Sequence, residues 1–442
     1  MNSPNPSPGQ ASLVRRLLIF IALVNLAEGL GQVGGVINQP LVYYLKEALG
    51  WAPDQVTRYI ALLIIPWVIK PIYGLLSDFV PILGYRRRPY LILANLLTVG
   101  GFLWITGLTA PAQILIALYI TAFGMAASST ITEAVLVETG NKVGMSGRFL
   151  NAQWMWFNVA SVTASLLGGW LAQRLSPHSA FHTAAWIAAF APIGAALTAW
   201  FLVAEDRTAV QPPRTDENVL LSGIFKNRQF WIVAGFLFLI NIVPSFGTPL
   251  YYHMVDDLRF SQQFIGILSA LAAVGSVLGS FVYAFAARRM TLKWLLYLSI
   301  ALGVIGNGSY VLMSSQVSAI IINVVGGVFG MIALVASLTV AAHAVPEKST
   351  GFAFALLMSV NNLAGQLSSN LGAWMFVHWF NNHLNPVIYI AAAATAATAL
   401  LVPMLKLGDQ GGNQLTARRN SALSLVHTGK KRRISGGMAS GF

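Results

Sequence analysis

Residues Leu62–Leu93 read LLIIPWVIKPIYGLLSDFVPILGYRRRPYLIL, and this stretch decides the fold. An apolar run that carries one lysine, Lys70, leads into a short loop with Asp78 and three arginines, and a second apolar run follows. Arginine resists crossing a bilayer, and short loops rich in Lys and Arg stay on the cytoplasmic side. The stretch therefore predicts two membrane helices joined by a charged cytoplasmic loop.

The composition extends this interpretation to the whole chain. Of the 442 residues, 56% are hydrophobic and only 9% are charged, and the mean hydropathy is +0.66. A water-soluble domain carries roughly 25% charged residues, so this chain cannot cover a soluble surface. Its apolar runs of about 20 residues have the length of a helix that crosses a bilayer. We expect an all-α integral membrane protein.

Gly, Pro and charged residues divide the apolar sequence into about twelve helices. The predicted spans are 14–45, 54–77, 89–108, 111–139, 146–174, 180–204, 228–252, 261–288, 292–313, 316–343, 350–380 and 384–407. We interpret the first as a retained helix rather than a secretory signal, because its apolar register continues past Glu28 to Leu45.

The basic residues are sorted by loop, so the net charge of +13 does not indicate nucleic-acid binding. Of the 27 Lys and Arg residues, twenty-two fall on the side of the arginine loop, and Lys70 lies within a helix. The four on the opposite side are Lys46, Arg58, Arg174 and Arg259. This bias predicts a multi-pass protein of the cytoplasmic (inner) membrane with both termini in the cytoplasm. The absence of cysteine excludes disulfides.

A repeat divides the chain into two halves. Gly147–Trp170 aligns without gaps on Gly351–Trp374, with Asn158 matching Asn362. Two six-helix halves in the same orientation form the parallel repeat of the major facilitator architecture, whose substrate site lies between the halves near the midplane. The expected parts are an N-terminal tail at 1–13, a six-helix bundle at 14–204, a cytoplasmic linker at 205–227, a second bundle at 228–407 and a basic cytoplasmic tail at 408–442.

Three ionisable residues fall within the apolar spans: Glu28, Lys70 and Glu133. An ionisable group in hydrocarbon costs about 2.5–3.5 kcal/mol on insertion scales, so each is a candidate for function. Lys70 and Glu133 both lie roughly 10 Å inside the cytoplasmic boundary at the helical rise. Equal depth predicts an ion pair between them, which either locks the bundle or contacts substrate.

Glu28 is expected near the midplane, because it lies roughly 18 Å beyond Arg16 at the helical rise. Polar residues expected on the same helix face are Asn25, Gln32, Gly35 and Gln39. A carboxylate in this position suits a proton carrier, and a hydrogen-bonded helix contact is the alternative interpretation.

The loop of the opening stretch has the features of a gate. Gly74 allows close helix approach, and Asp78 can face the N-terminal dipole of the helix that begins near Thr350. The arginines Arg86, Arg87 and Arg88 can pair with acids of the other half. Positive-inside anchoring accounts for one or two of these arginines, but it does not explain the spacing of Gly74 and Asp78.

Polar and aromatic residues recur at helical intervals on the spans 146–174, 228–252 and 350–380, as the walls of a cavity would. Candidate substrate contacts are Gln32, Asn151, Trp154, Asn158, Tyr251, Asn362 and Gln366. A bundle core or an interfacial belt is the alternative role for the aromatic residues. The sequence has no metal-ligand cluster, phosphate loop or nucleophile–base pattern, so we expect no metal, no cofactor and no enzymatic activity.

Lys70–Tyr90 resembles the signature of the folate–biopterin transporter family of the major facilitator superfamily, with its Lys-Pro, Tyr-Gly, Ser-Asp and three arginines. The stretches TEAVLVETG from Thr132 and FALLMSVNNLAG from Phe354 are similar to two further parts of that family. Glu133 stands where the family usually has aspartate. The resemblance implies transport of folates or related pteridines, often coupled to protons, with Lys70, Asp78, Arg86–Arg88 and Glu133 carrying the function.

We therefore expect a secondary active transporter, a proton-coupled symporter of folates or pteridines, that works by alternating access. Its expected partners are the small-molecule substrate, protons and the lipid bilayer, without nucleic acid, and we expect a monomer. One rival is a facilitator of another solute, such as a peptide, a sugar derivative or a tetrapyrrole. The other rival is a transport-inactive membrane assembly factor.

Overall fold

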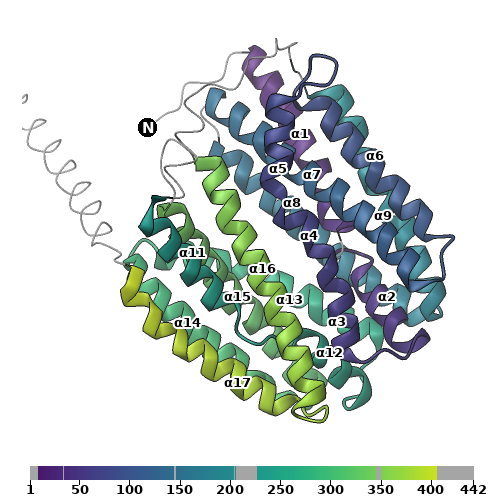
Figure 1. The fold of residues 1–442 in the computed structure, drawn as a ribbon, viewed down its shortest axis with the longest axis vertical. Helices are drawn as coiled ribbons and strands as arrows, with labels where there is room; N and C mark the ends of the chain where they lie inside the picture. Colours follow the sequence, from purple (N-terminus) through teal and green to yellow (C-terminus); the bar gives the residue numbers. More distant parts are fainter. Residues whose placement is uncertain are drawn as a thin grey trace, which may run out of the picture.

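The structure of the chain is a computed structural model that describes residues 8–32, 34–143, 146–203, 205, 226–344 and 350–405. Within these ranges the chain is almost entirely helical (Figure 1). Helices lie in every one of the spans predicted from the sequence, so the expected all-α architecture is confirmed.

The first half of the chain contributes six of the predicted spans. Its elements are α1 (Pro8–Gly31), α2 (Asn38–Tyr43), a π-helical turn (Tyr44–Ala48), α3 (Pro53–Ala61), a 3-10 turn (Leu62–Ile64), α4 (Ile65–Val68), α5 (Lys70–Phe79), α6 (Arg88–Ile105), α7 (Pro111–Val143), α8 (Ser146–Arg174) and α9 (Pro177–Leu202). The first helix begins at Pro8, within the predicted tail, because proline suits the first helical turn, where its missing N–H needs no partner.

The first predicted span is broken, and the expectation of a continuous helix at 14–45 is wrong. The second, 54–77, is long and apolar enough to cross a membrane as Pro53–Ser77, but its helix is irregular. After α1 the chain folds back so closely that a Cβ on Gly35 would lie 2.2 Å from the carbonyl oxygen of Leu30. Within the second span, the regular helix is interrupted at Ile69, between α4 and α5. Pro71 causes this break, because its ring lacks an N–H and clashes with the carbonyl four residues earlier.

The second half supplies the other predicted spans. Its elements are α11 (Arg228–Asn241), α12 (Gly247–Asp256), α13 (Gln262–Ala286), α14 (Leu292–Ser309), a 3-10 turn (Tyr310–Leu312), α15 (Gln316–Ala344), α16 (Thr350–His378), α17 (Leu384–Ala397) and a 3-10 helix (Thr398–Leu405). The span predicted at 228–252 is also broken, between α11 and α12. There the Ser245 N–H donates to the Ser368 carbonyl of α16 at 3.1 Å, so α16 covers the broken backbone.

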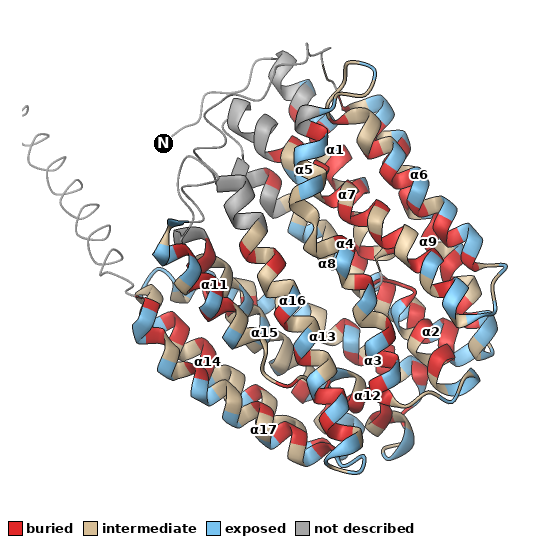
Figure 2. Ribbon diagram, in the orientation of Figure 1, coloured by how far each residue is buried: buried red, intermediate tan, exposed pale blue. Residues whose placement is uncertain are grey.

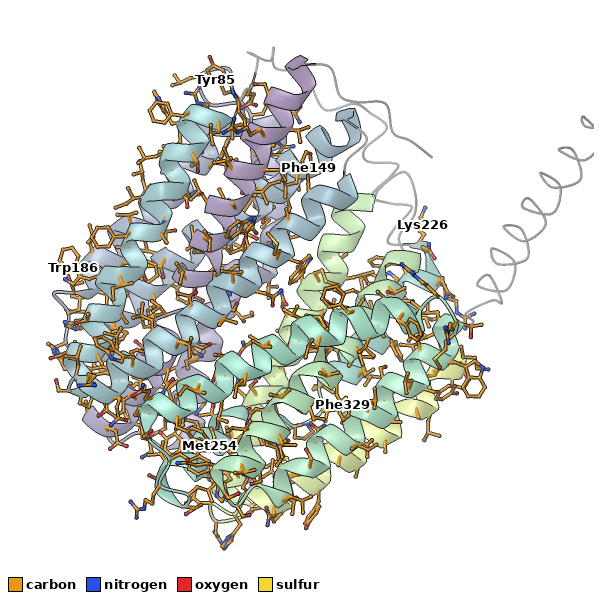
Figure 3. All side chains as sticks on the ribbon, turned by 180° about the vertical axis from the view of Figure 1, so that it is seen from behind. Tyr85, Phe149, Trp186, Lys226, Met254 and Phe329 are labelled. Carbon is orange, nitrogen blue, oxygen red and sulfur yellow. The ribbon has the colours of Figure 1, made fainter. Side chains whose placement is uncertain are left out.

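The two halves pack through α8 against α13 and through α3 to α5 against α16. In Figure 3 they meet near Met254 and diverge toward the end where Phe149 and Lys226 lie. We call the end with Arg86–Arg88 the arginine end, and the end with Trp51 and Asp256 the far end. The boundaries of the predicted bundles stay predictions, and residues 206–225 of the linker and the tail lie outside the described residues.

Many large apolar side chains are exposed on the surface, as hydrocarbon requires and water would not tolerate. Examples are Phe201, 72% exposed, and Phe281, 69% exposed. Figure 2 shows that exposed residues recur along the helices of both halves. Among the described residues, eight helices are long and apolar enough to cross a membrane, including α7, α9, α13 and α15. The predicted spans that contain α1, α8, α11 and α16 are not among these eight, and the total of twelve crossings stays a prediction.

A glycine pair brings the halves into backbone contact. Gly169 on α8 faces Gly266 on α13, and a Cβ on Gly266 would lie 2.6 Å from the Ser165 carbonyl oxygen and 2.8 Å from the Gly169 Cα. Small residues at such positions allow membrane helices to pack backbone to backbone. The contact between the halves therefore depends on the absence of a side chain at these two positions.

We predict that Gly266→Ala lowers the Tm of the purified protein, because the added methyl group forces α8 and α13 apart. Overpacking of this kind costs about 1–3 kcal/mol. Gly330→Ala is the matched control, because its Cβ would meet no atom within 4 Å. Thermal unfolding in one detergent measures both variants, and an equal Tm for the two would contradict this account of the contact.

Candidate functional site

The ion pair predicted from equal depth is present. Lys70 Nζ lies 3.2 Å from Glu133 Oε1, joining the start of α5 to α7. The side chain of Lys70 is 17% exposed and that of Glu133 is 49% exposed. Lys70 Nζ also donates to Ser129 Oγ at 3.1 Å and lies 5.3 Å from the centre of the Trp67 ring, a cation–π distance. The lysine thus has a carboxylate, a hydroxyl and an aromatic face as neighbours.

The break at Ile69 places Lys70 in this position. Lys70 is the first residue of α5, where the positive end of the helix dipole disfavours a cation. A nearby carboxylate offsets that cost, and Glu133 provides it. Gly74, one turn further along α5, faces Thr130 of α7 and leaves room for the two helices to approach. The motif Lys-Pro-Ile-Tyr-Gly therefore supplies the lysine of the ion pair. Its proline and glycine also shape the backbone that places this lysine beside α7.

Glu28 on α1 belongs to the same cluster. Its partly buried side chain interacts electrostatically with Lys70 and Glu133. From the sequence we predicted a pair of Lys70 with Glu133 and considered Glu28 separately. In the structure all three ionisable residues of the apolar spans lie together. With both carboxylates ionised, the cluster formed by Glu28, Lys70, Glu133 and Ser129 has one negative charge more than its lysine neutralises.

The polar stripe expected along the first span does not continue on one helix. Asn25 is buried and donates to the Ile21 carbonyl, and Gln32 follows the end of α1, where it is partly buried. Gln39 lies beyond the break, on α2, and donates to the Gln262 side chain of the other half at 3.0 Å. The expectation of a single stripe from residue 25 to 39 is wrong past Gln32, because the helix ends at Gly31.

The predicted contacts on α8 and α16 have mixed surroundings. Trp154 is exposed and packs edge-on against Phe157, while Asn158 donates to the Trp154 carbonyl of its own helix at 2.7 Å. Asn362 is partly buried, as is Gln366, whose carbonyl accepts a hydrogen bond from Asn370. The side chain of Asn151 lies outside the described residues. Substrate contact by these residues stays a prediction.

Tyr251 lies at the far end instead of beside the ion pair. Its hydroxyl donates to Gln262 Oε1 at 2.9 Å, and Gln39 Nε2 donates to the same oxygen and to the Gln262 carbonyl at 2.7 Å. These three residues join α2, α12 and α13 beside the Gly169–Gly266 contact. Sequence reasoning missed Gln262, because its partners come from segments far apart in the chain.

Contacts between ionisable side chains also join the halves at the far end. Lys46 Nζ lies 2.7 Å from both Glu47 and Asp256, and His378 of α16 lies 3.6 Å from the buried Asp54 of α3. Partial burial lowers the pKa of Lys46, but hydrogen bonds to Asp256 and Glu47 outweigh that effect and the pKa is raised. The far end is therefore held by ionic, amide and glycine contacts between the two halves.

The arginine loop contacts its own half. The backbone N–H groups of Arg86, Arg87 and Arg88 all donate to the carboxylate of Glu205, at 2.7–3.0 Å. The Arg87 side chain donates to Ser77 Oγ at 2.5 Å, and the Arg88 guanidinium lies 4.7 Å from the Trp200 ring centre. Pairing of the arginines with the other half stays a prediction, and the Asp78 side chain lies outside the described residues.

Glu205 was not singled out in the sequence as a functional residue. It follows α9 and accepts hydrogen bonds at the start of α6, where helix N–H groups have no partner in the helix. A carboxylate is favoured there by the helix dipole. The signal available in the sequence was an acid that ends an apolar span opposite a loop with three consecutive basic residues.

Solved structures with the same fold are transporters. A mutant form of the nucleoside transporter NupG superposes with a TM-score of 0.71 at 14% identity, over 88% of this chain and all of that one. A D-xylose-proton symporter gives a TM-score of 0.68 at 13% identity, over 88% and 97%. The fold is therefore that of the major facilitator superfamily.

Sequence comparison identifies the family. The chain belongs to the BT1 family, whose profile matches residues 31–387. The Folate-biopterin transporter of Synechocystis sp. is 26% identical over 423 residues, 90% of this chain and 83% of that protein. Folate transporter 1 of Plasmodium falciparum is 25% identical over 375 residues, 80% of this chain and 72% of that protein. The chain is thus a multi-pass membrane transporter, and the resemblance of Lys70–Tyr90 is confirmed.

We predict that Lys70→Met destabilises the protein more than Lys70→Met/Glu133→Gln does. The single variant leaves two carboxylates without a cation, whereas the double variant removes one of them. For Lys70→Met we expect the free energy of unfolding to fall by about 1–3 kcal/mol, between the values for exposed and fully buried ion pairs. Thermal unfolding of Lys70→Met, Glu133→Gln and the double variant completes a double-mutant cycle. Lys293→Met, at an exposed lysine, is the control. Strictly additive losses would contradict direct coupling.

We predict that Glu205→Ala lowers Tm, because loss of a helix cap costs about 0.5–2 kcal/mol. The Tm of Glu205→Gln should lie between those of Glu205→Ala and the unchanged protein, because one side-chain oxygen still accepts hydrogen bonds. Hydrogen exchange of the Arg86–Arg88 amides measures the cap directly, and it should accelerate in Glu205→Ala but not in Asp257→Asn, an exposed acid at the far end. Unchanged exchange in Glu205→Ala would show that the cap contributes nothing.

Proposed function

We propose that this chain carries folates or related pteridines across the membrane as a secondary active transporter coupled to protons. The observation that carries the proposal is the cluster of Glu28, Lys70 and Glu133 within the membrane spans. Intramembrane ionisable residues mark substrate and proton pathways. The names of the relatives, a folate-biopterin transporter and a folate transporter, support the choice of substrate.

Lys70 is the proposed anchor for the substrate anion. Folates combine carboxylates with a flat heterocycle, and Lys70 offers a cation beside the aromatic side chain of Trp67. Glu133 is half exposed, so an arriving carboxylate can compete with it for the lysine. The amides and indole proposed to line the remaining path are Gln32, Asn151, Trp154, Asn158, Asn362 and Gln366.

Charge balance supports proton coupling. Two carboxylates beside one lysine leave one negative charge uncompensated in a region of low dielectric constant, and an anionic substrate would add more. Binding one proton makes the cluster neutral before the substrate enters, which lowers the electrostatic cost of binding an anion. We place that proton on Glu28, because Glu133 already forms the ion pair with Lys70.

Alternating access is proposed from the uneven contacts between the halves. The far end is closed by the Gly169–Gly266 contact, by Lys46 with Asp256 and by Gln39 with Gln262. The excess of basic residues supports a cytoplasmic arginine end and both termini inside. Opening the far end would break these contacts, with Gly74, Asp78 and Arg86–Arg88 acting as the latch that closes the arginine end.

Another cargo is the second candidate. The same fold occurs in a D-xylose-proton symporter and in a POT family transporter bound to a thioalcohol-conjugated peptide, both with an identity of 12–13% to this chain. At that identity the likeness concerns the fold alone. A transport-inactive assembly factor is the third candidate. It would be recognised by a protein that neither binds nor transports any of the solutes tested.

The test is uptake of labelled folate into proteoliposomes with and without a pH gradient. We predict that the gradient drives accumulation, that Glu28→Gln loses accumulation but keeps folate exchange at equal pH, and that Lys70→Met/Glu133→Gln loses both. Lys293→Met should transport normally. Uptake that unlabelled pterin does not inhibit but a peptide or sugar does would favour the second candidate. Normal transport by the double variant would make the ion pair purely structural.

A further inference from the structure

A groove lies where α3 meets α16, near the far end. Figure 1 shows these two helices, one from each half, side by side on the near face of the molecule, and they are in contact. The groove has a volume of about 700 Å³, and neither Lys70 nor Glu133 lines it. The lining residues that matter here come from both halves: Gln55, Arg58, Ala61, Leu62 and Ile65 from the first, and Asn370 from the second.

The groove changes in character along its length. Arg58, Leu62 and Ile65 follow one another at intervals of four and three residues, so they share one face of the helical span Pro53–Ser77. Ile65 lies roughly 10 Å deeper in the membrane than Arg58 at the helical rise. Leu62 is 47% exposed and Ile65 is 46% exposed. A cation near the membrane surface above an exposed apolar strip matches the two parts of a phospholipid, a charged headgroup and an acyl chain.

Asp54 holds the cation of this groove in place. Arg58 Nη2 lies 2.7 Å from Asp54 Oδ2, and Arg58 Nε donates to the Asp54 carbonyl at 3.4 Å. The side chain of Asp54 is 6% exposed and that of Arg58 is 66% exposed, so the carboxylate is buried and the guanidinium faces the groove. A guanidinium has five N–H donors, and the contacts with Asp54 use two of them within the described part of the chain. The others can donate to a phosphate, whose oxygens match their fork geometry.

We propose that this groove binds a phospholipid with an anionic headgroup, whose phosphate lies on Arg58 and one of whose acyl chains lies along Leu62 and Ile65. Lipid is the occupant because the groove lies within a membrane span and is open on its apolar side. The charge of Arg58 favours an anionic headgroup over a neutral one. The exposed Gln55 supports this choice, because its Oε1 accepts from the Ala52 N–H at 2.9 Å and its amide N–H groups can donate to headgroup oxygens.

A lipid in this groove would contact both halves of the protein. Arg58 belongs to α3 and Asn370 to α16, and the carboxylate that holds Arg58 also lies 3.6 Å from His378 of α16. The bound lipid would therefore stabilise the arrangement in which the halves are joined at the far end, because it binds both walls at once. This inference does not depend on the cargo, so it can fail or hold independently of the proposed function.

The test is native mass spectrometry of the purified full chain with phosphatidylglycerol, which is anionic, and phosphatidylcholine, which is zwitterionic, with the same acyl chains. We predict that phosphatidylglycerol binds more tightly. Arg58→Gln should weaken its binding about tenfold, the scale of one hydrogen bond to a charged group, and leave phosphatidylcholine binding unchanged. Arg174→Gln is the matched control, because Arg174 is also an exposed arginine near the far end and does not line the groove.

A second variant keeps the Arg58–Asp54 pair, because Arg58→Gln also leaves the buried Asp54 carboxylate without its arginine. Ala61→Phe fills part of the groove and should abolish the preference for phosphatidylglycerol. Ala284→Phe adds the same volume at an exposed position of α13 and should bind like the unchanged protein. Phosphatidylglycerol should raise the Tm of the unchanged protein and of Ala284→Phe, but not that of Ala61→Phe.

Three results would overturn the proposal. The first is equal binding of the two lipids, or a preference that survives both Arg58→Gln and Ala61→Phe. The second is displacement of phosphatidylglycerol by an equal concentration of glycerol phosphate, which would show an anion site that needs no acyl chain. The third is a protein dimer in the mass spectrum that Ala61→Phe dissociates, which would show that a second copy of the chain covers the groove.

Discussion

A lysine that lies within a membrane span must find an anion, and much of the first half is arranged to meet that requirement. Lys70 begins α5, so it also faces the unfavourable end of a helix dipole. Glu133 offsets both costs at 3.2 Å, and Ser129 and Trp67 also lie beside the ammonium group. Once Glu28 joins them, the cluster carries more negative charge than one lysine balances. An arrangement built only for stability would have no reason to keep the second carboxylate.

Broken helices create a second requirement, because backbone groups left without a helical partner are costly at membrane depth unless protein covers them. The break between α4 and α5 exposes the Val68 carbonyl, and the Ser359 hydroxyl of α16 donates to it at 2.6 Å. The break between α11 and α12 is covered by Ser368, also on α16. One helix of the second half therefore satisfies breaks in both halves. The first of these contacts lies two residues from Lys70, so under the proposed alternating access a movement of α16 would directly affect the backbone that supports the ion pair.

The features that could be predicted from the sequence are those that depend on local residue pattern and on depth in the membrane. The helical ranges follow from apolar runs, and the Lys70–Glu133 pair follows from two residues at equal depth on helices of one bundle. The breaks at Gly35 and Ile69 were missed, although Pro71 and the glycines were visible, because apolar periodicity continues across them. The convergence of Glu28 with the pair was also missed, since it depends on how α1 rotates against its neighbours. Tyr251 shows the same limit: its aromatic character suggested a substrate contact, but its partners Gln39 and Gln262 come from distant segments.

The two ends of the molecule differ in how their contacts can be broken. At the far end, the Gly169–Gly266 contact has no adaptable side chain between the backbones, so it is either closely packed or lost. The ionic contacts there include Lys46 with Asp256, whose side chain is 51% exposed, so water compensates when this pair separates. The buried amide contact of Gln262 with Tyr251 and Gln39 has less access to water, and separating it leaves polar groups that need new partners. Under the proposed alternating access, the amide and glycine contacts would therefore oppose opening more than the ion pairs do. Proton binding at the cluster could change that balance only through the helices that join the two regions, and α1 is one of them: it carries Glu28 and ends at the break that leads to Gln39.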